Sequence, residues 1–163
     1  MDQPPPIRLA QWNDATPIAV MSRDLIERGL GWSWTAARVR RSIVDRHTNV
    51  VVVPTGEGGI AGFGIMKYDD EEAHLLLLAV RPVLGRRGIG SRLLHWLEKA
   101  ALVAGIRQIQ VEARVTNGAA RSFYRRHGYR EVALLPGYYS GREASVRLVK
   151  ELRRPLTQAQ NQA

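Results

Sequence analysis

A glycine- and arginine-rich turn, "GRRGIGSRLL" from Gly85 to Leu94, has the residue types that bind an anion. Gly88 and Gly90 remove side chains where the chain enters an expected helix, so a ligand can approach the backbone closely. The first N–H groups of a helix have no partner within it, and the helix dipole favours an anion there. Arg86 and Arg87 add positive charge at the same place. The pattern predicts a phosphate-binding turn, and its alternative is a glycine turn that only starts a helix.

Two common nucleotide-binding motifs do not fit this turn. A P-loop needs G-x-x-x-x-G-K-[ST], which does not occur in the sequence. A dinucleotide fingerprint needs a third glycine where Leu93 stands, and it belongs to the first βα turn of a doubly wound sheet. The type of phosphate ligand must therefore come from the rest of the chain.

Composition limits the class of protein. The chain has 163 residues, 45% of them apolar, which is typical of one domain, and we expect a single domain over 1–152 with a disordered polar tail over 153–163. Its net charge of +9 comes almost entirely from arginine and favours an anionic partner without identifying it. The absence of cysteine excludes disulfides, cysteine nucleophiles and thiolate metal sites. The four histidines lack ligand spacing, so we expect no metal.

The sequence also bears on location. It contains no apolar run long enough for a membrane span, and "MDQPPPIRLA" lacks the basic and apolar regions of a signal peptide. We therefore expect a cytoplasmic protein with no membrane partner.

Hydrophobic patterning predicts an α/β protein with a mixed sheet: antiparallel N-terminal strands, then a parallel central pair, flanked by helices. The apolar run "AHLLLLAV" over 73–80 predicts a central strand buried on both faces. A helix and a strictly alternating strand follow it, and this βαβ order makes the two strands parallel. The expected strands are 7–12, 49–54, 60–68, 73–80, 107–115, 129–135 and 144–152; the expected helices are 14–31, 35–47, 88–104 and 117–128.

The helix after the glycine turn is amphipathic. Its apolar face is expected to carry Ile89, Leu93, Leu94, Leu97, Ala100, Ala101 and Ala104, and its polar face Ser91, Arg92, His95, Glu98 and Lys99.

The glycine turn resembles the acetyl-coenzyme A motif of the GNAT superfamily of N-acetyltransferases, [QR]-x-x-G-x-[GA] after a strand ending in Val. Val80 ends the strand, and the pattern falls on Gly85, Gly88 and Gly90. Gly85 departs from the usual Gln or Arg, so Arg86 or Arg87 would have to replace a contact to the pyrophosphate. The resemblance implies that acetyl-CoA is the cosubstrate and that it is lined by Leu78, Ala79, Val80, Gly85, Arg86, Arg87, Gly88, Ile89, Gly90 and Ser91.

A second stretch, "NGAARSFYRRHGY", resembles the superfamily pattern N-x-x-A-x-x-[FL]-Y-x-x-x-G-[FY]. The matching residues are Asn117, Ala120, Phe123, Tyr124, Gly128 and Tyr129. The two motifs occur in the right order, and the resemblance covers about 7–152. It implies the GNAT fold and adds Asn117 to the cofactor-binding residues, while Asn117 can also cap the helix that follows it. The nearest motifs are those of ribosomal-protein N-terminal alanine acetyltransferases.

The resemblance also assigns catalytic roles. Tyr124 is the candidate general acid for the leaving thiolate, because a phenol with a pKa of about 10 can protonate a thiolate whose conjugate acid has a pKa of about 8.5. Glu112, twelve positions earlier, is the candidate base. The alternatives are a tyrosine that only packs beside Ala120 and a glutamate paired with Arg114 or Arg130. The oxyanion could rest on the Val80 amide, as in the superfamily.

Two aromatic loops are candidates for the acceptor site: "GLGWSW" with Trp32 and Trp34, and "LPGYYSGREAS" with Tyr138 and Tyr139. Ordinary loop packing is the alternative for all four. An α-amine, with a pKa of about 7.8, is neutral far more often at pH 7 than a lysine with a pKa of about 10.4. A peptide or protein N-terminus is therefore the preferred acceptor, and a small amine or an antibiotic is the second choice.

Two other functional classes stay open at this point. A basic nucleic-acid-binding module would explain the charge, yet the sequence has no helix-turn-helix, zinc or RNP signature, so nucleic acid is not required. A non-catalytic acetyl-CoA-binding protein would fit the Gly85 departure. The sequence does not choose between a monomer and a homodimer.

Overall fold

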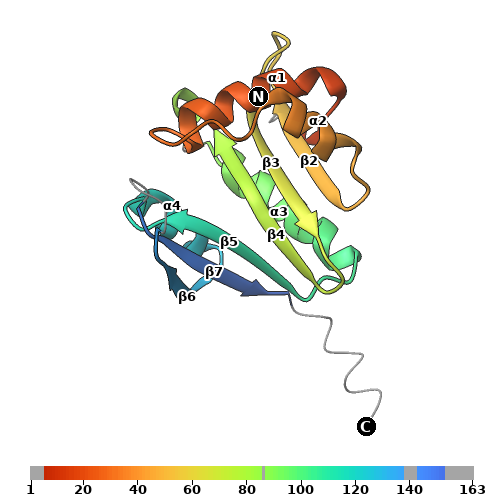
Figure 1. Ribbon diagram of the computed structural model, residues 1–163. Coiled ribbons are helices and arrows are strands. Elements are labelled where there is room, and N and C mark those ends of the chain that lie inside the picture. The colour runs from red at the N-terminus through yellow and green to blue at the C-terminus, as the bar shows by residue number, and fades with distance from the viewer. Residues whose placement is uncertain (1–5, 86, 138–142, 153–163) are drawn as a thin grey trace. The chain divides into compact units, whose positions relative to one another are not determined.

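The computed structural model describes residues 6–85, 87–137 and 143–152. Arg86, Tyr138, Tyr139 and the expected tail over 153–163 lie outside the described residues. In chain order the strands are β1 (Arg8–Leu9), β2 (Thr48–Pro54), β3 (Ile60–Tyr68), β4 (Glu72–Val80), β5 (Gln108–Arg114), β6 (Arg130–Leu135) and β7 (Ser145–Glu151). The α-helices are α1 (Ala15–Met21), α2 (Ala36–Val44), α3 (Ile89–Val103) and α4 (Gly118–Arg126), and a π-helical turn, Ser22–Ile26, extends α1 (Figure 1).

The described strands form one sheet in the order β1-β2-β3-β4-β5-β7-β6. β1 pairs with β2 and β2 with β3, both antiparallel, and β7 is antiparallel to both β5 and β6. β4 and β5 are also neighbours in this order, and the α3 crossover that connects them in the chain makes them the parallel pair. The expected mixed sheet, with antiparallel N-terminal strands followed by a parallel central pair, is confirmed.

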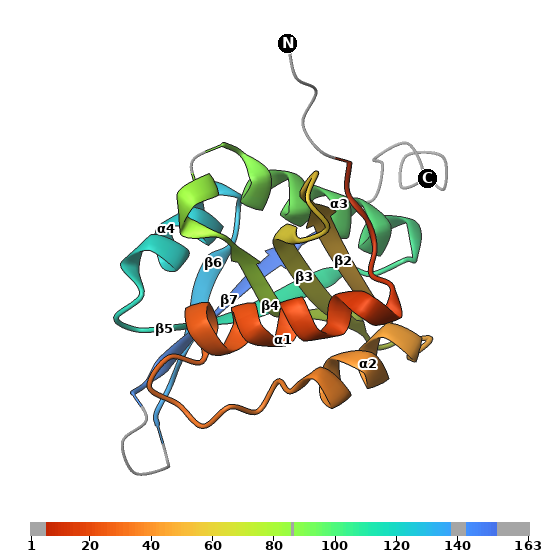
Figure 2. The ribbon, with the colours of Figure 1, turned by 90° about the horizontal axis from the view of Figure 1, so that it is seen from above.

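The chain divides into two compact units, of which the first contains the described residues of 1–67 together with 75–97. Here α1 and α2 lie side by side over one face of β2 and β3, and α3 starts on the opposite face (Figure 2). The side chains of β3 explain this layering, because they alternate between the two faces. Phe63 and Ile65 belong to the buried core that includes Ile18 and Val39 from the first two helices.

The second unit contains 68–74 and the described residues from 98 onward. Its strands β5, β7 and β6 are antiparallel neighbours, with Val111 opposite Leu148 and both buried. The alternation predicted for β5 is confirmed, because Ile109, Val111 and Ala113 are buried while Glu112 is exposed. Asn117 caps α4 as expected: its side-chain oxygen accepts a hydrogen bond from the Ala120 N–H at 3.0 Å.

Three local predictions are wrong. The first strand covers only Arg8–Leu9, because the Asp14 carboxylate accepts hydrogen bonds from Gln11 N and Arg8, both at 2.7 Å, and the chain turns there. β4 is not buried on both faces: Ala73, Leu75, Leu77 and Ala79 are buried, but the alternate residues are only half-buried. An apolar run shows that both faces of a strand are apolar, but it does not show how completely other protein atoms cover each face.

The third error concerns α3. Its apolar face is largely as expected, with Leu93, Leu94 and Leu97 fully buried. Ala104 is exposed, as are Leu102 and Val103 in the last turn of α3. Glu98, expected on the polar face, is only 8% exposed. It can be buried because two side chains satisfy its carboxylate, as shown below. No helix within the described ranges is both long enough and apolar enough to span a membrane.

Candidate active site

The predicted cofactor turn lies between β4 and α3. β4 ends at Val80, and the chain passes through a short 3₁₀ turn, Pro82–Leu84, before Gly85. Gly88 has a backbone φ of 76°, a left-handed conformation that favours glycine. At the start of α3, Arg92 N donates to Gly88 O at 3.0 Å, so the amides of Ile89 and Gly90 precede this helical hydrogen bond in the first turn. Such amides can bind an anion.

Hydrogen bonds to β3 hold the start of this turn. The Arg81 backbone N–H donates to Ala61 O at 2.9 Å, and its side-chain Nε donates to Ile60 O at 2.7 Å. The neighbouring Gly62 allows β3 to approach β4 closely, since a Cβ there would lie 2.8 Å from the Ala79 carbonyl oxygen. The end of β4 therefore has a well-defined position relative to β3.

The residues assigned to the cofactor differ in exposure. Gly85, Arg87 and Gly88 are exposed, so the backbone of the turn is open to a ligand. Leu78, Val80, Gly90 and Ser91 are half-buried, while Ala79 and Ile89 belong to the buried interior. The half-covered apolar side chains at the end of β4 are followed along the chain by the amides of the first turn of α3. This combination suits a ligand with a phosphate group and an apolar arm.

Tyr124, the candidate acid, lies on α4 in the second unit with 6% of its surface exposed. Its ring contacts Phe123 and Tyr129 at centroid distances of 5.2 and 5.5 Å, both edge-to-face. Burial raises the pKa of its phenol, so the group stays protonated at neutral pH. Among the described residues its hydroxyl has no hydrogen-bond partner. A buried hydroxyl without a protein partner is suited to donating to a bound molecule.

Glu112, the candidate base, lies on β5 with 40% of its side chain exposed. It forms an ion pair with Arg147 at 3.4 Å, and not with Arg114 or Arg130 as the sequence suggested. The reason is the strand register, which places Glu112 directly opposite Arg147 on β7. Glu112 and Tyr124 make no direct hydrogen bond with each other in the part of the chain that the structure describes.

His74 was missed by the sequence analysis as a neighbour of this base. It lies on β4 and is half-buried. Burial lowers its pKa, the charge of Arg147 lowers it further, and the charge of Glu112 opposes both. A histidine inside an apolar strand was the sequence signal for a special environment. Only the pairing of β5 with β7 shows that Glu112 and Arg147 are the charges near it.

The two tryptophans of the first aromatic loop have different environments. Trp34 is 7% exposed and packs into the core, with the Arg38 guanidinium 3.8 Å from its ring centroid. Trp32 is 43% exposed, and its indole N–H donates to the Ala19 carbonyl at 3.2 Å. Of the two, Trp32 has the surface to contact an acceptor. Tyr138 and Tyr139 of the second loop lie outside the described residues.

The buried carboxylate of Glu27 organises this loop. It accepts hydrogen bonds from Ser33 N at 2.7 Å, Ser33 Oγ at 2.6 Å and Ser22 Oγ at 3.0 Å, and also from Trp34 N. Burial alone would raise the pKa of Glu27, but these hydrogen bonds outweigh it and lower the pKa. The charged form therefore stabilises the native loop.

We expect Glu27→Gln to lower the free energy of unfolding by about 1–3 kcal/mol at pH 7, because an amide NH₂ would meet donors in a buried site. The native pKa is depressed, so this stabilisation is complete above the ordinary value of 4.5 and is lost as pH falls through the lower native value. Urea unfolding at pH 7 and at pH 4 or below measures the free energy of unfolding. The difference between Glu27→Gln and the unmodified protein should shrink at low pH. Glu57→Gln, at an exposed turn, is the matched control; an equal loss in both variants would contradict this role.

Two further site predictions concern Asn117 and metal ions. The resemblance assigns Asn117 to the cofactor. In the structure its side-chain oxygen accepts a hydrogen bond from the α4 backbone, so Asn117 caps the N-terminus of α4. Across the described ranges, no group of three or more histidine, aspartate or glutamate side chains could hold a metal ion.

Comparisons with known proteins identify the family. The acetyltransferase (GNAT) domain model matches residues 46–131. An uncharacterized N-acetyltransferase of Methanocaldococcus jannaschii is 35% identical over 106 residues, covering 64% of this chain and 68% of the relative. The ribosomal protein bS18-alanine N-acetyltransferase of Escherichia coli K12 is 28% identical over 123 residues, covering 74% and 82%. The chain therefore belongs to the GNAT acetyltransferase family.

A solved structure shares the fold. The PaiA N-acetyltransferase of Thermoplasma acidophilum, crystallised in complex with coenzyme A, superposes with a TM-score of 0.75 at 19% identity, covering 90% of this chain and 98% of that one. Family membership makes this chain an N-acetyltransferase, and acetyl-CoA is the acetyl donor that the family uses.

Proposed function

We propose that this enzyme transfers the acetyl group of acetyl-CoA directly to the α-amine of a peptide or protein N-terminus. The observation that carries the proposal is the Tyr124 hydroxyl, which is buried, protonated and without a partner among the described residues. A thioester needs such a donor when its thiolate leaves. The backbone amides of Ile89 and Gly90 in the first turn of α3 bind the pyrophosphate, and the positive charge of Arg87 strengthens this binding.

The chemical step forms one bond and breaks another. The neutral amine nitrogen attacks the thioester carbonyl carbon, and the Val80 amide stabilises the resulting oxyanion. The C–S bond then breaks, and the sulfur takes the Tyr124 proton. Glu112, exposed and paired with Arg147, accepts the proton released by the amine through a water molecule, and solvent returns a proton to Tyr124.

Three arguments support an N-terminal α-amine as acceptor. Its pKa of about 7.8 leaves a useful neutral fraction at pH 7, which a weak carboxylate base can use. The E. coli relative acts on an alanine of a ribosomal protein, by its name. The net charge of +9 disfavours polycationic amines and suits acidic peptides or proteins bound to nucleic acid.

We further propose one catalytic domain over 1–152, and the cytoplasmic location stays a prediction from the sequence.

A binding measurement followed by an acceptor screen tests this function. Acetyl-CoA should raise the melting temperature of the protein. Release of free thiol should then be measured with a peptide that begins with alanine, with the same peptide blocked at its N-terminus but carrying an internal lysine, and with small amines including an aminoglycoside. Activity confined to the unblocked peptide supports the proposal; turnover of only the lysine or the small amines contradicts it.

We expect Gly88→Ala to weaken acetyl-CoA binding by about tenfold, because an alanine resists φ of 76° and the backbone at the start of α3 would have to change conformation. Gly58→Ala is a matched control: Gly58 has φ of 83°, a Cβ there also meets open space, and it lies in the β2–β3 hairpin turn. Calorimetric titration measures the affinity. We expect both variants to lose a similar amount of stability, and only Gly88→Ala to lose affinity for acetyl-CoA. Unchanged affinity in Gly88→Ala would show that the turn does not bind acetyl-CoA.

A further inference from the structure

A buried polar cluster that the proposed mechanism does not use lies within the second unit. The Glu98 carboxylate, on α3, accepts a hydrogen bond from the Tyr129 hydroxyl at 2.8 Å. Lys150 on β7 contacts the same carboxylate, with its Nζ 3.1 Å from Oε2. Glu98 is 8% exposed and Tyr129 is 3% exposed. The cluster therefore joins three separate segments of the chain through one carboxylate.

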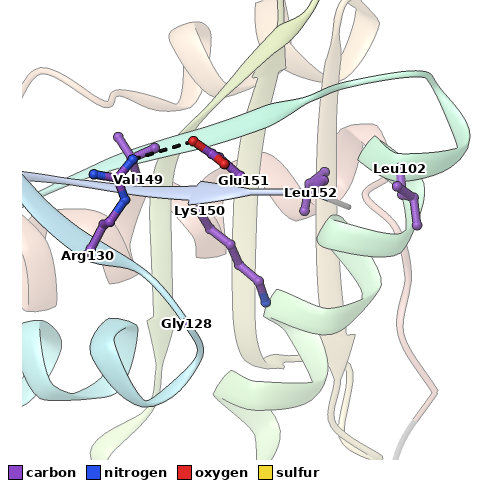
Figure 3. Close-up of a pocket in the computed structure, with 7 residues that line it drawn as sticks. All are labelled: Leu102, Gly128, Arg130, Val149, Lys150, Glu151 and Leu152. Carbon is purple, nitrogen blue, oxygen red and sulfur yellow. Dashed lines mark hydrogen bonds and ion pairs between the residues drawn. The ribbon is translucent and has the colours of Figure 1, made fainter. Parts of the chain in front are cut away.

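Burying this carboxylate is costly, and its two partners offset the cost. Lys150 neutralises the charge, and Figure 3 shows its side chain extending from β7 toward α3 along a pocket of about 440 Å³ that Gly128 and Arg130 also line. Burial and the charge of Glu98 both raise the pKa of the Tyr129 phenol. The phenol therefore remains a donor, and its O–H direction is set by Glu98.

Tyr129 in turn contacts the candidate acid. Its ring lies edge-to-face against the Tyr124 ring, with centroids 5.5 Å apart at an angle of 64°. The Tyr129 N–H also donates to the Tyr124 carbonyl at 3.0 Å, where α4 ends. Phe123 contacts the Tyr124 ring as well, at 5.2 Å. The Tyr124 ring therefore contacts two aromatic rings, those of Phe123 and Tyr129. The Tyr129 ring is in turn held by the hydrogen bond between its hydroxyl and the Glu98 carboxylate.

We propose that Glu98 and Tyr129 are positioning residues that set the orientation of the Tyr124 hydroxyl. This inference rests on the proposed role of Tyr124 as the acid. Glu98 holds the Tyr129 hydroxyl, the Tyr129 ring limits the tilt of the Tyr124 ring, and the Tyr124 hydroxyl thereby keeps the direction in which it donates its proton. Neither positioning residue touches the reacting atoms.

The test combines single and double variants. Tyr129→Phe keeps the ring and removes the hydrogen bond to Glu98; Glu98→Gln removes the charge at nearly constant size. Each should lower kcat by roughly tenfold to a hundredfold with the alanine peptide, while the KM for acetyl-CoA stays unchanged. In the Tyr124→Phe background the same changes should have no further effect on kcat, because they act through a hydroxyl that is already absent. Glu151→Gln, which removes an exposed carboxylate from the same strand as Lys150, is the control.

The outcomes separate the two proposals. If Tyr129→Phe leaves kcat unchanged, or if its effect multiplies with that of Tyr124→Phe, the positioning role is overturned while the acid role of Tyr124 stands. If Tyr124→Phe itself leaves kcat unchanged, the acid role fails and the positioning role fails with it. Melting temperatures and acetyl-CoA titrations of every variant show whether a loss of kcat comes from unfolding; both substitutions are nearly isosteric, so at least one folded variant is expected.

Discussion

Tyr124→Phe should lower kcat by about 10²- to 10⁴-fold, the usual contribution of a general acid. The substitution removes one oxygen from a buried ring and leaves its contacts with Phe123 and Tyr129 in place. Acetyl-CoA affinity should therefore change little, because the glycine turn that we propose binds the pyrophosphate is untouched. Steady-state thiol release gives kcat, and calorimetric titration gives the affinity.

Tyr68→Phe is the matched control, since Tyr68 is the last residue of β3 and has no assigned role. The pH profile adds a second readout. Burial raises the pKa of Tyr124, so its protonated form persists at alkaline pH, and any alkaline fall of kcat due to Tyr124 should lie above the ordinary phenol value of about 10. Full activity in Tyr124→Phe would exclude this residue as the acid.

Gly62→Ala should lower the free energy of unfolding by about 1–3 kcal/mol and reduce activity as well. The new methyl carbon would lie 2.8 Å from the Ala79 carbonyl oxygen and 3.2 Å from the Leu93 side chain. A backbone oxygen in a paired strand cannot move aside as a side chain can, so β4 must shift near the end that we propose holds the thioester. Urea unfolding and acetyl-CoA titration measure the two effects.

Gly56→Ala provides the comparison, because a Cβ at Gly56 meets no atom within 4 Å in the β2–β3 turn. It should unfold at nearly the same urea concentration as the unmodified protein. If Gly62→Ala is equally harmless, β3 and β4 do not approach as closely as the structure shows, and the position of the cofactor turn would need revision.

Much of the local structure follows from the order of residues along the chain. The apolar period of α3, the alternation of β5 and the cap at Asn117 depend on neighbours three or four positions away at most, so a single sequence contains them. The same holds for Gly88, where the turn needs a residue that tolerates positive φ. The family resemblance then connected these elements to acetyl transfer, and the comparisons confirm the family.

The errors arise where partners come from distant segments. Glu98 looks like a solvent-facing residue of α3 until Tyr129 and Lys150 are brought to it from 31 and 52 positions away. Glu112 pairs with Arg147 because two strands far apart in sequence adopt one register. The sequence of β4 predicts burial on both faces, because apolar residues alone do not show which atoms cover each face of the strand.

The sequence by itself therefore determined the class of fold and the position of the glycine turn, and it nominated that turn for phosphate binding and Tyr124 as the acid, since these depend on short-range patterns. The tertiary structure decided which charges are buried, which ion pairs form and what holds Tyr124 in place. The physical reason is that desolvation and pairing energies depend on distances through space, and folding sets those distances between residues that are remote along the chain.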